Sequence, residues 1–282
     1  MLEDDVKEIE AIEKVIQNYG EAFNEWNIEK LVAAFHPESM TVWYIPERGG
    51  FISGMCYGWV RSFVRNQKED LGMKFYVTPE EIHQKGTAAY ARVRFLIDDP
   101  EGPRDTTDYL TFIKFGSNWN VINKSGFTED VSKEELERRL EEKTEKPRNN
   151  PEEIKQIKQI LQTYADAFHE YDFRKIEETF HPKVRLTSYI PKKEDFWNEP
   201  RPIFLWKESF AKQTDDKTSF DITIGDIDQT GTSAIAIMKW IAHTPTGIGD
   251  TTDFLTLLKI DGKWLIVNKT CDIVFKEKEA IK

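Results

Sequence analysis

Residues 105–124 read DTTDYLTFIKFGSNWNVINK, and residues 250–269 read DTTDFLTLLKIDGKWLIVNK. The two stretches share an acidic start, an apolar middle and a Trp…Asn-Lys ending, and they lie 145 residues apart. Self-similarity at so long a period indicates a duplicated domain of about 140 residues, because solenoid repeats are shorter.

The same shift aligns further motifs on both sides of these stretches. The aligned pairs are Tyr19-Gly-Glu-Ala-Phe23 with Tyr164-Ala-Asp-Ala-Phe168, Phe35-His36-Pro37 with Phe180-His181-Pro182, and Tyr44-Ile45-Pro46 with Tyr189-Ile190-Pro191. Between the copies, residues 142–151 are polar, contain two prolines and lack apolar periodicity, which is typical of a linker. We therefore predict a first domain at residues 1–143, a linker at 144–151 and a second domain at 152–282.

Composition narrows the class of protein. The chain has 282 residues, a formal net charge of −11 and a pI near 5.1, which argues against nucleic acid or an anionic membrane as partner. Two cysteines at non-equivalent positions do not form a disulfide framework, and the first residues lack the pattern of a signal peptide. We expect a cytoplasmic protein. Because no phosphate loop or paired metal-ligand spacing is present, we expect neither cofactor nor metal.

Apolar periodicity predicts the same order of elements in each copy. Ile9, Ile12, Ile16, Tyr19 and Phe23 recur at spacings of three and four, which indicates a helix, and Asn27 can cap a short second helix. A strand at 40–45, a helix at 59–67 and strands at 74–78, 88–97, 106–114 and 119–123 follow. This order predicts an α+β domain with helices on one face of a curved antiparallel sheet. The other face needs a cover, which a second copy in the chain supplies as an intrachain pseudo-dimer, so a monomer is expected.

The element order, the Phe-His-Pro motif and the quoted Thr-Thr-Asp…Trp…Asn-Lys ending resemble the NTF2-like (SnoaL-like) superfamily of cystatin-like α+β cones. Within it, they are most similar to the group named putative lumazine-binding proteins. The resemblance covers nearly the whole chain twice and implies two cone-shaped domains, each with room for a small-molecule pocket. The superfamily contains isomerases, dehydratases, cyclases, hydrolases and non-catalytic modules, so the fold alone does not settle the function.

The resemblance also implies candidate catalytic residues, through the ketosteroid isomerase pattern of a tyrosine and a protonated aspartate that donate to an oxyanion. The tyrosine on the first helix matches Tyr19 and Tyr164, and the aspartate at the start of a late strand matches Asp108 and Asp253. The general base of that pattern lies just before a proline in the first strand. There, the segments 41–46 and 187–191 contain no carboxylate, so proton abstraction of the isomerase kind is not expected.

Each candidate also has a structural interpretation. A buried tyrosine can be a core residue with a backbone partner, and a strand-start aspartate can bond to nearby threonines. Lysines at the last strand can attract an anionic ligand, pair with the aspartates or face solvent, and histidines before proline can act as bases or cap a helix. The candidate ligand-binding residues are Trp43, Lys124, Tyr189, Lys269, His36 and His181.

These observations predict a small-molecule-binding protein whose ligand is apolar or aromatic with one polar oxygen. Any catalysis would be cofactor-independent acid–base catalysis of the isomerase, dehydratase or hydrolase type. The alternative is a non-catalytic pseudo-dimeric scaffold or protein-interaction module, which the absent base favours.

Overall fold

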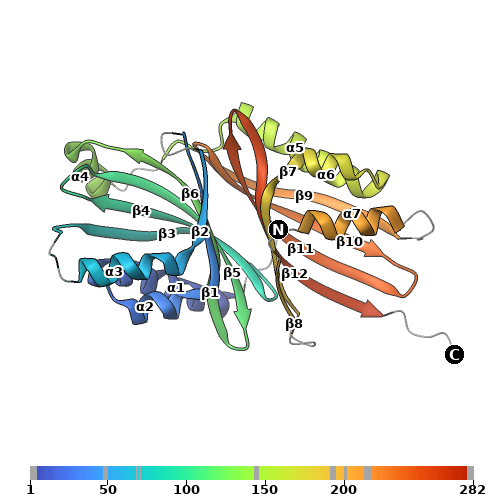
Figure 1. The fold of residues 1–282 in the computed structure, drawn as a ribbon, viewed down its shortest axis with the longest axis horizontal. Coiled ribbons are helices and arrows are strands. Elements are labelled where there is room, and N and C mark those ends of the chain that lie inside the picture. Colours follow the sequence, from blue (N-terminus) through green and yellow to red (C-terminus); the bar gives the residue numbers. More distant parts are fainter. Residues whose placement is uncertain are drawn as a thin grey trace.

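A computed structural model describes residues 5–46, 50–67, 69, 71–142, 146–190, 195–199, 202–212 and 218–277. The chain forms two halves, each a six-stranded sheet with helices packed against it, and the strands of the two halves meet in the middle of the molecule (Figure 1). This arrangement confirms the predicted α+β pseudo-dimer of two NTF2-like halves. Residues 144–145 of the predicted linker lie outside the described residues.

The first half contains, in chain order, α1 (Val6–Glu25), α2 (Ile28–Ala34), β1 (Phe35–Ile45), β2 (Gly50–Met55), α3 (Val60–Asn66), β3 (Lys74–Lys85), β4 (Ala88–Asp98), β5 (Arg104–Phe115), β6 (Asn118–Asp130) and α4 (Lys133–Glu142). The second half contains α5 (Pro151–Glu170), α6 (Phe173–Thr179), β7 (Phe180–Ile190), β8 (Asp195–Glu199), α7 (Pro202–Lys212), β9 (Ser219–Thr230), β10 (Ser233–His243), β11 (Gly247–Ile260) and β12 (Lys263–Glu277).

The first helix forms as its apolar stripe predicts. Ile12, Ile16 and Tyr19 are buried, and the Asp5 side chain caps the helix by accepting from the backbone N–H of Lys7 at 3.0 Å. Trp26 ends the helix in the left-handed conformation, with φ of 50°. Asn27 then accepts from the backbone N–H of Lys30 at 3.1 Å, which confirms its predicted role as the cap of α2.

The predicted capping role of the two histidines is wrong. β1 begins at Phe35, so His36 lies inside a strand, and its Nδ1 accepts a hydrogen bond from the backbone N–H of Glu38 at 3.2 Å. His181 does the same with Lys183 at 3.1 Å. Among the described residues, no hydrogen bond joins either ring to a carbonyl at the end of α2 or α6, which is what capping requires.

Each sheet is mixed rather than wholly antiparallel. In the first half the strand order is β2-β1-β6-β5-β4-β3, and β1 pairs with β6 in parallel while the other neighbours are antiparallel. The strands also extend beyond the predicted bounds, because ladder hydrogen bonds continue past the apolar segments that reveal a strand in the sequence. β2 and α4 were not anticipated.

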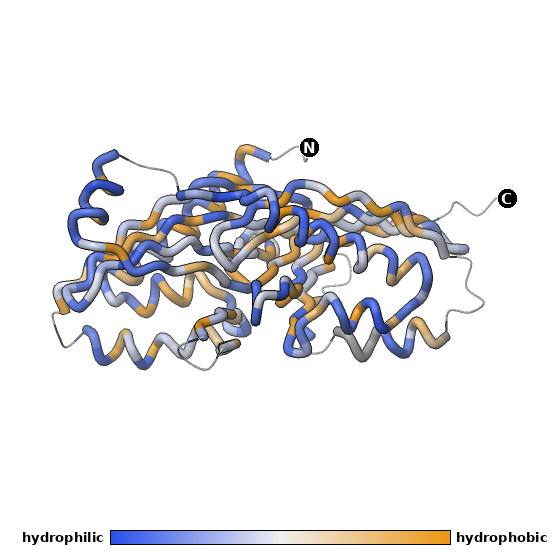
Figure 2. The backbone as a smooth tube through the Cα atoms, turned by 90° about the horizontal axis from the view of Figure 1, so that it is seen from above, coloured by the Kyte–Doolittle hydropathy of each residue, from blue (hydrophilic) through white to orange (hydrophobic). Residues whose placement is uncertain are grey.

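The two faces of each sheet pack against different parts of the molecule. On the inner face, which the helices cover, Ala89, Ala91, Val93 and Phe95 of β4 pack against α1. On the outer face, Tyr90 and Tyr109 pack against Ile235, Ile237 and Phe254 of the other half. Figure 2 shows the hydrophilic helix α4 on the opposite side of the strands from the other helices at its end of the molecule.

Candidate functional site

Three predicted residues from distant parts of the sequence meet on the inner face of the first sheet. Tyr19 of α1 donates its hydroxyl hydrogen bond to Asp108 Oδ2 of β5 at 2.9 Å. The ammonium group of Lys124 on β6 pairs with the other carboxylate oxygen of Asp108. Asp108 is 0% exposed, Tyr19 1% and Lys124 5%, so this Tyr–Asp–Lys array is buried.

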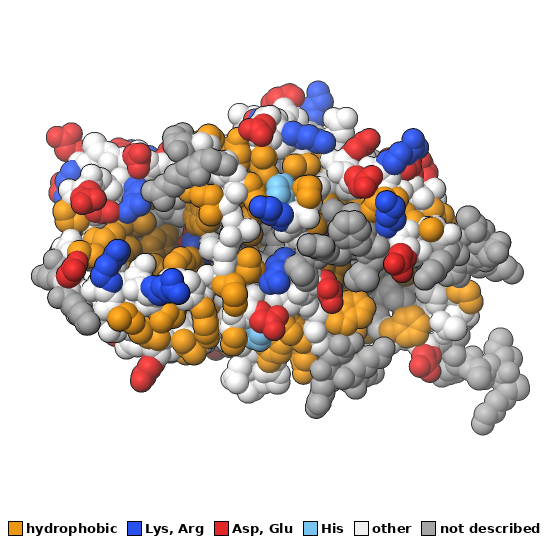
Figure 3. All heavy atoms as spheres, viewed as in Figure 1, with side chains coloured by type: hydrophobic (Ala, Val, Ile, Leu, Met, Phe, Trp, Pro, Cys, Tyr) orange, Lys and Arg blue, Asp and Glu red, His pale blue; other side chains and the backbone are white. Residues whose placement is uncertain are grey.

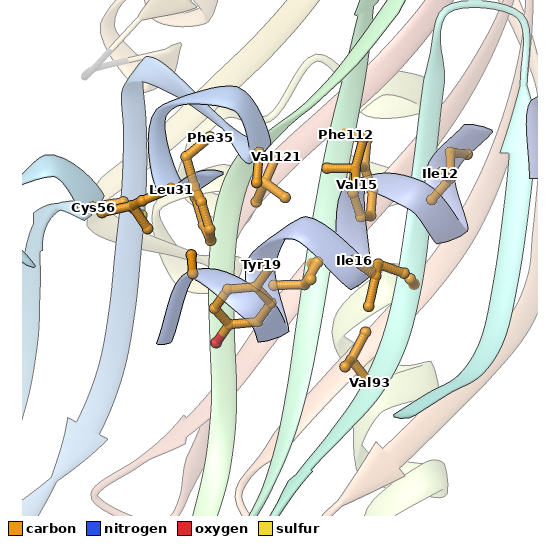
Figure 4. Packing of buried hydrophobic residues seen from close by; sticks show 14 of the residues in the cluster. Ile12, Val15, Ile16, Tyr19, Leu31, Phe35, Cys56, Val93, Phe112 and Val121 are labelled. Carbon is orange, nitrogen blue, oxygen red and sulfur yellow. The ribbon is translucent and has the colours of Figure 1, made fainter. Parts of the chain in front are cut away.

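Aromatic rings surround the array. Lys124 Nζ lies 4.9 Å from the ring centroid of Trp43 and 5.6 Å from that of Tyr19, distances at which a ring face attracts a cation. The Tyr19 ring stacks on Phe95 with centroids 5.2 Å apart. Figure 4 shows Tyr19 among the buried apolar side chains, with its hydroxyl at the edge of the cluster.

The electrostatics set the role of each group. Burial, followed by the nearby charge of Asp108, raises the pKa of Tyr19 well above its usual value, so the hydroxyl stays protonated and donates. Asp108 accepts from Tyr19 and pairs with the Lys124 ammonium, so both carboxylate oxygens already contact protein groups. The isomerase-like role would instead require a protonated aspartate that donates to a ligand oxygen. The geometry therefore makes Asp108 the counter-ion that holds Lys124 in place.

The second half repeats the ion pair but not the whole array. Asp253 pairs with Lys269, and both side chains are buried. Burial raises the pKa of Asp253, against the opposing effects of Lys269 and the Trp240 indole. The Tyr164 ring packs on Trp240, with centroids 4.9 Å apart. Among the described residues, no hydrogen bond joins Tyr164 to Asp253.

Three predicted ligand-binding residues lie elsewhere, at the contact between the halves. His36 stacks on Phe115, with ring centroids 4.9 Å apart, and Tyr189 packs against the same ring at 5.0 Å. His181 stacks on Phe51 at 3.8 Å. Burial lowers the pKa of both histidines, which favours neutral rings at pH 7. The structure does not bring these residues to either Tyr–Asp pair.

Sequence reasoning did not assign Phe95 to the site, whereas Trp240 is one of several tryptophans that it offers as lining for an aromatic pocket. The two residues occupy equivalent positions at the shift of 145 and contact the two tyrosines. Strand alternation could have placed Phe95 on the inner face, because residues two apart on a strand share a face and Val93 belongs to the inner cluster, as Figure 4 also shows.

Pockets lined by described residues open at other places. One of about 320 Å³ lies against Trp264 and α5, one of about 350 Å³ lies beside Trp26 and Met73, and one of about 470 Å³ lies between the halves. None of these three is lined by Tyr19 or Asp108. In Figure 3 the face of the first half is hollowed over the sheet between α3 and α4, with hydrophobic side chains around the hollow.

The described residues offer neither a metal site nor a membrane-spanning helix. No group of three or more His, Cys, Asp and Glu side chains in the described ranges is arranged to hold a metal ion. No helix in that part of the chain combines the length and apolar character needed to cross a bilayer.

Known structures similar to this chain each cover about half of it. An NTF2-like protein of unknown function from Shewanella baltica is 21% identical and covers 46% of this chain and 99% of its own, with a TM-score of 0.38. An uncharacterised protein with a cystatin-like fold from Caulobacter vibrioides is 19% identical and covers 49% and 99%, with a TM-score of 0.35. A protein described as a putative scytalone dehydratase from Novosphingobium aromaticivorans is 16% identical and covers 45% and 89%, with a TM-score of 0.35.

No curated protein matches the chain. The sequence pattern of one family matches it twice, at residues 7–126 and 152–272, and these ranges cover most of both halves. The second range ends just beyond Lys269, and the first ends just beyond Lys124, so each match contains one complete set of the tyrosine, aspartate and lysine positions. The chain therefore belongs to the family described as "Putative lumazine-binding", of which it carries two tandem copies.

Proposed function

We propose that this protein binds a small, planar and largely apolar molecule that carries an oxygen acceptor, and that the site lies in the first half. The observation that carries the proposal is the Tyr19–Asp108–Lys124 array beside the Trp43 ring. Asp108 neutralises and orients the lysine, so the ammonium offers a fixed hydrogen-bond donor to a ligand oxygen. Aromatic rings next to a fixed polar group are the usual lining of a small-molecule site.

The family description supports the same class of ligand. Lumazine is a fused, planar heteroaromatic molecule with carbonyl oxygens, so it combines a stacking surface with acceptors for Lys124. Binding is favoured over acid–base catalysis because Asp108 already accepts from Tyr19 and pairs with Lys124. The first half is favoured because Ser188 stands in the second half where Trp43 stands in the first.

The test is a fluorescence titration of the full chain with lumazine as the probe. Trp43→Ser copies the residue of the second half and removes the stacking ring. Stacking on an aromatic side chain contributes about 1–3 kcal/mol, so affinity should fall roughly 5- to 150-fold. Trp197→Ser is the matched control, because Trp197 is 45% exposed on β8, and it should leave the affinity unchanged.

A second candidate function is a pseudo-dimeric scaffold without a ligand. It is favoured by the mutual pairing of the buried Asp–Lys groups in both halves, which satisfies their charges within the protein. A scaffold predicts no saturable lumazine signal in the wild-type chain. Saturable binding that Trp43→Ser and Trp197→Ser weaken equally would instead place the ligand outside the proposed site.

A further inference from the structure

A polar pocket of about 470 Å³ opens on the outer face of the first sheet, between the two halves. Its walls come from both halves and from the segment that joins them: Glu80, Glu81, Arg92, Thr107, Lys146, Arg148 and Thr230. The pocket therefore depends on the tandem arrangement. It lies across the sheet from the Tyr19–Asp108 array, so the inference below does not rest on the proposed function.

The joining segment is held firmly at the edge of the pocket. The backbone N–H of Asn149 donates to the Gln229 carbonyl at 2.8 Å, and the backbone N–H of Gln229 donates to Asn149 Oδ1 at 2.8 Å. Asn150 adds a third hydrogen bond to Gln229 at 3.0 Å. These contacts fix the positions from which Lys146 and Arg148 reach the pocket.

Arg92 is the central group of the pocket, and its hydrogen-bonding capacity is not used fully. The residue is only 8% exposed, and its guanidinium lies 3.3–3.6 Å from carboxylate oxygens of Glu80, Glu81 and Asp228. Its Nε makes no hydrogen bond to any described residue. A buried guanidinium N–H without a hydrogen bond is costly, and a ligand that supplies an acceptor offsets that cost.

The other half shows that the fold does not require these charges. At the shift of 145, Ile237 stands in place of Arg92 and Phe254 in place of Tyr109, and both are buried in the apolar contact between the halves. Tyr109 donates to Asp228 at 2.6 Å, whereas its counterpart Phe254 has no such group. Buried charge is rarely better for stability than apolar packing, so stability alone does not account for the charged side.

We propose that this pocket binds a small carboxylic acid that also carries a hydroxyl or amino group. The carboxylate accepts hydrogen bonds from the guanidinium of Arg92, which matches a carboxylate in a planar, two-point geometry. The hydroxyl or amino group donates to Glu80 on the neighbouring strand, because Glu81 is already hydrogen-bonded to His83 at 2.9 Å. A mixture of both charges on the walls selects such a molecule over a simple anion.

The first experiment compares three matched probes by calorimetry and thermal shift on the full chain: succinate, L-malate and L-aspartate. Malate adds one hydroxyl to succinate, and aspartate adds one amino group. We expect malate or aspartate to bind at least tenfold more tightly than succinate and to raise the melting temperature. Absence of binding by all three, or equal binding of all three, would overturn the proposal.

Variants then locate the binding. Arg92→Gln should abolish binding, and Glu80→Gln should reduce the preference for malate or aspartate over succinate. Arg92→Gln removes the cation that faces Glu80 and one of the two that face Glu81 and Asp228, so it could fail to fold, and Glu80→Gln decides the question in that event. Lys30→Gln removes a cation from the ion pairs with Glu21 and Glu25 on the helix-covered side of the first sheet, so it should leave binding unchanged. Binding unaffected by Glu80→Gln would refute the assignment.

Discussion

The hydroxyl groups of Tyr19 and Tyr164 offer a direct test of how different the two halves have become. Tyr19 donates to a fully buried carboxylate at 2.9 Å, whereas no hydrogen bond joins Tyr164 to Asp253 in the described residues. Replacing each tyrosine with phenylalanine removes one oxygen and preserves the ring packing. The two substitutions are therefore chemically identical, and they differ only in whether a hydrogen bond is lost.

The expected costs follow from that difference. A hydrogen bond to a charged group contributes about 1.5–3 kcal/mol, and Asp108 keeps its pairing with Lys124, so we expect Tyr19→Phe to lower the free energy of unfolding by about 2 kcal/mol. Tyr164→Phe removes no such bond and changes the volume little, so we expect a loss of about 0.5 kcal/mol.

Urea denaturation gives the overall change, and amide hydrogen exchange assigns it to a half, because two packed halves need not unfold as a single unit. The loss in Tyr19→Phe should appear as faster exchange in β5 and β6 of the first half. Equal losses in the two variants, or a larger loss in Tyr164→Phe, would refute the difference that we infer between the arrays.

Three further predictions concern buried charges and thiols. Lys124→Met should lower the free energy of unfolding by about 3–5 kcal/mol because it leaves Asp108 buried without its cation, and adding Asp108→Asn should restore part of that loss in denaturant titrations. Burial acts to raise the pKa of Asp105, but Arg94, Lys146 and Arg139 together lower it. The stability that Asp105 contributes is therefore present above the unfolded pKa of about 3.9 and is lost as the pH falls through the lower folded pKa. The difference in the free energy of unfolding between wild type and Asp105→Asn, measured by urea denaturation, should close below about pH 4. Burial raises the pKa of Cys56 and Cys271 to about 12, so a thiol-disulfide reagent at pH 8 should label both only after unfolding, and rapid labelling of the native protein would contradict this.

Much of the architecture could be predicted because it depends on local patterns. The stripe of Ile12, Ile16 and Tyr19 has helical spacing, and Asn27 is a good cap, so α1 and α2 were foreseen. The edge strand β2 was missed because its sequence, GFISGM, has two glycines and little alternation. Helix α4 was missed because it is almost wholly charged and buries only Leu136.

The candidate site could be predicted only in part. Tyr19, Asp108 and Lys124 were named separately, and their meeting depends on the register that places Leu110 opposite Lys124 and Asp108 opposite Gly126. His36, His181 and Tyr189 were named as well, but strand direction turns their side chains to the contact between the halves, which no local pattern reveals.

By itself, the sequence determined the duplication, the helix and strand types and the residue chemistry, because repeats and periodicity are properties of order along the chain. Only the tertiary structure decided that Asp108 is held by Tyr19 and Lys124, that no hydrogen bond in the described part of the chain joins Tyr164 to Asp253, and that Arg92 and the joining segment enclose a polar pocket. The physical reason is that these outcomes depend on distances of a few ångströms between residues far apart in the sequence, and such distances are set by sheet register and by packing between the halves.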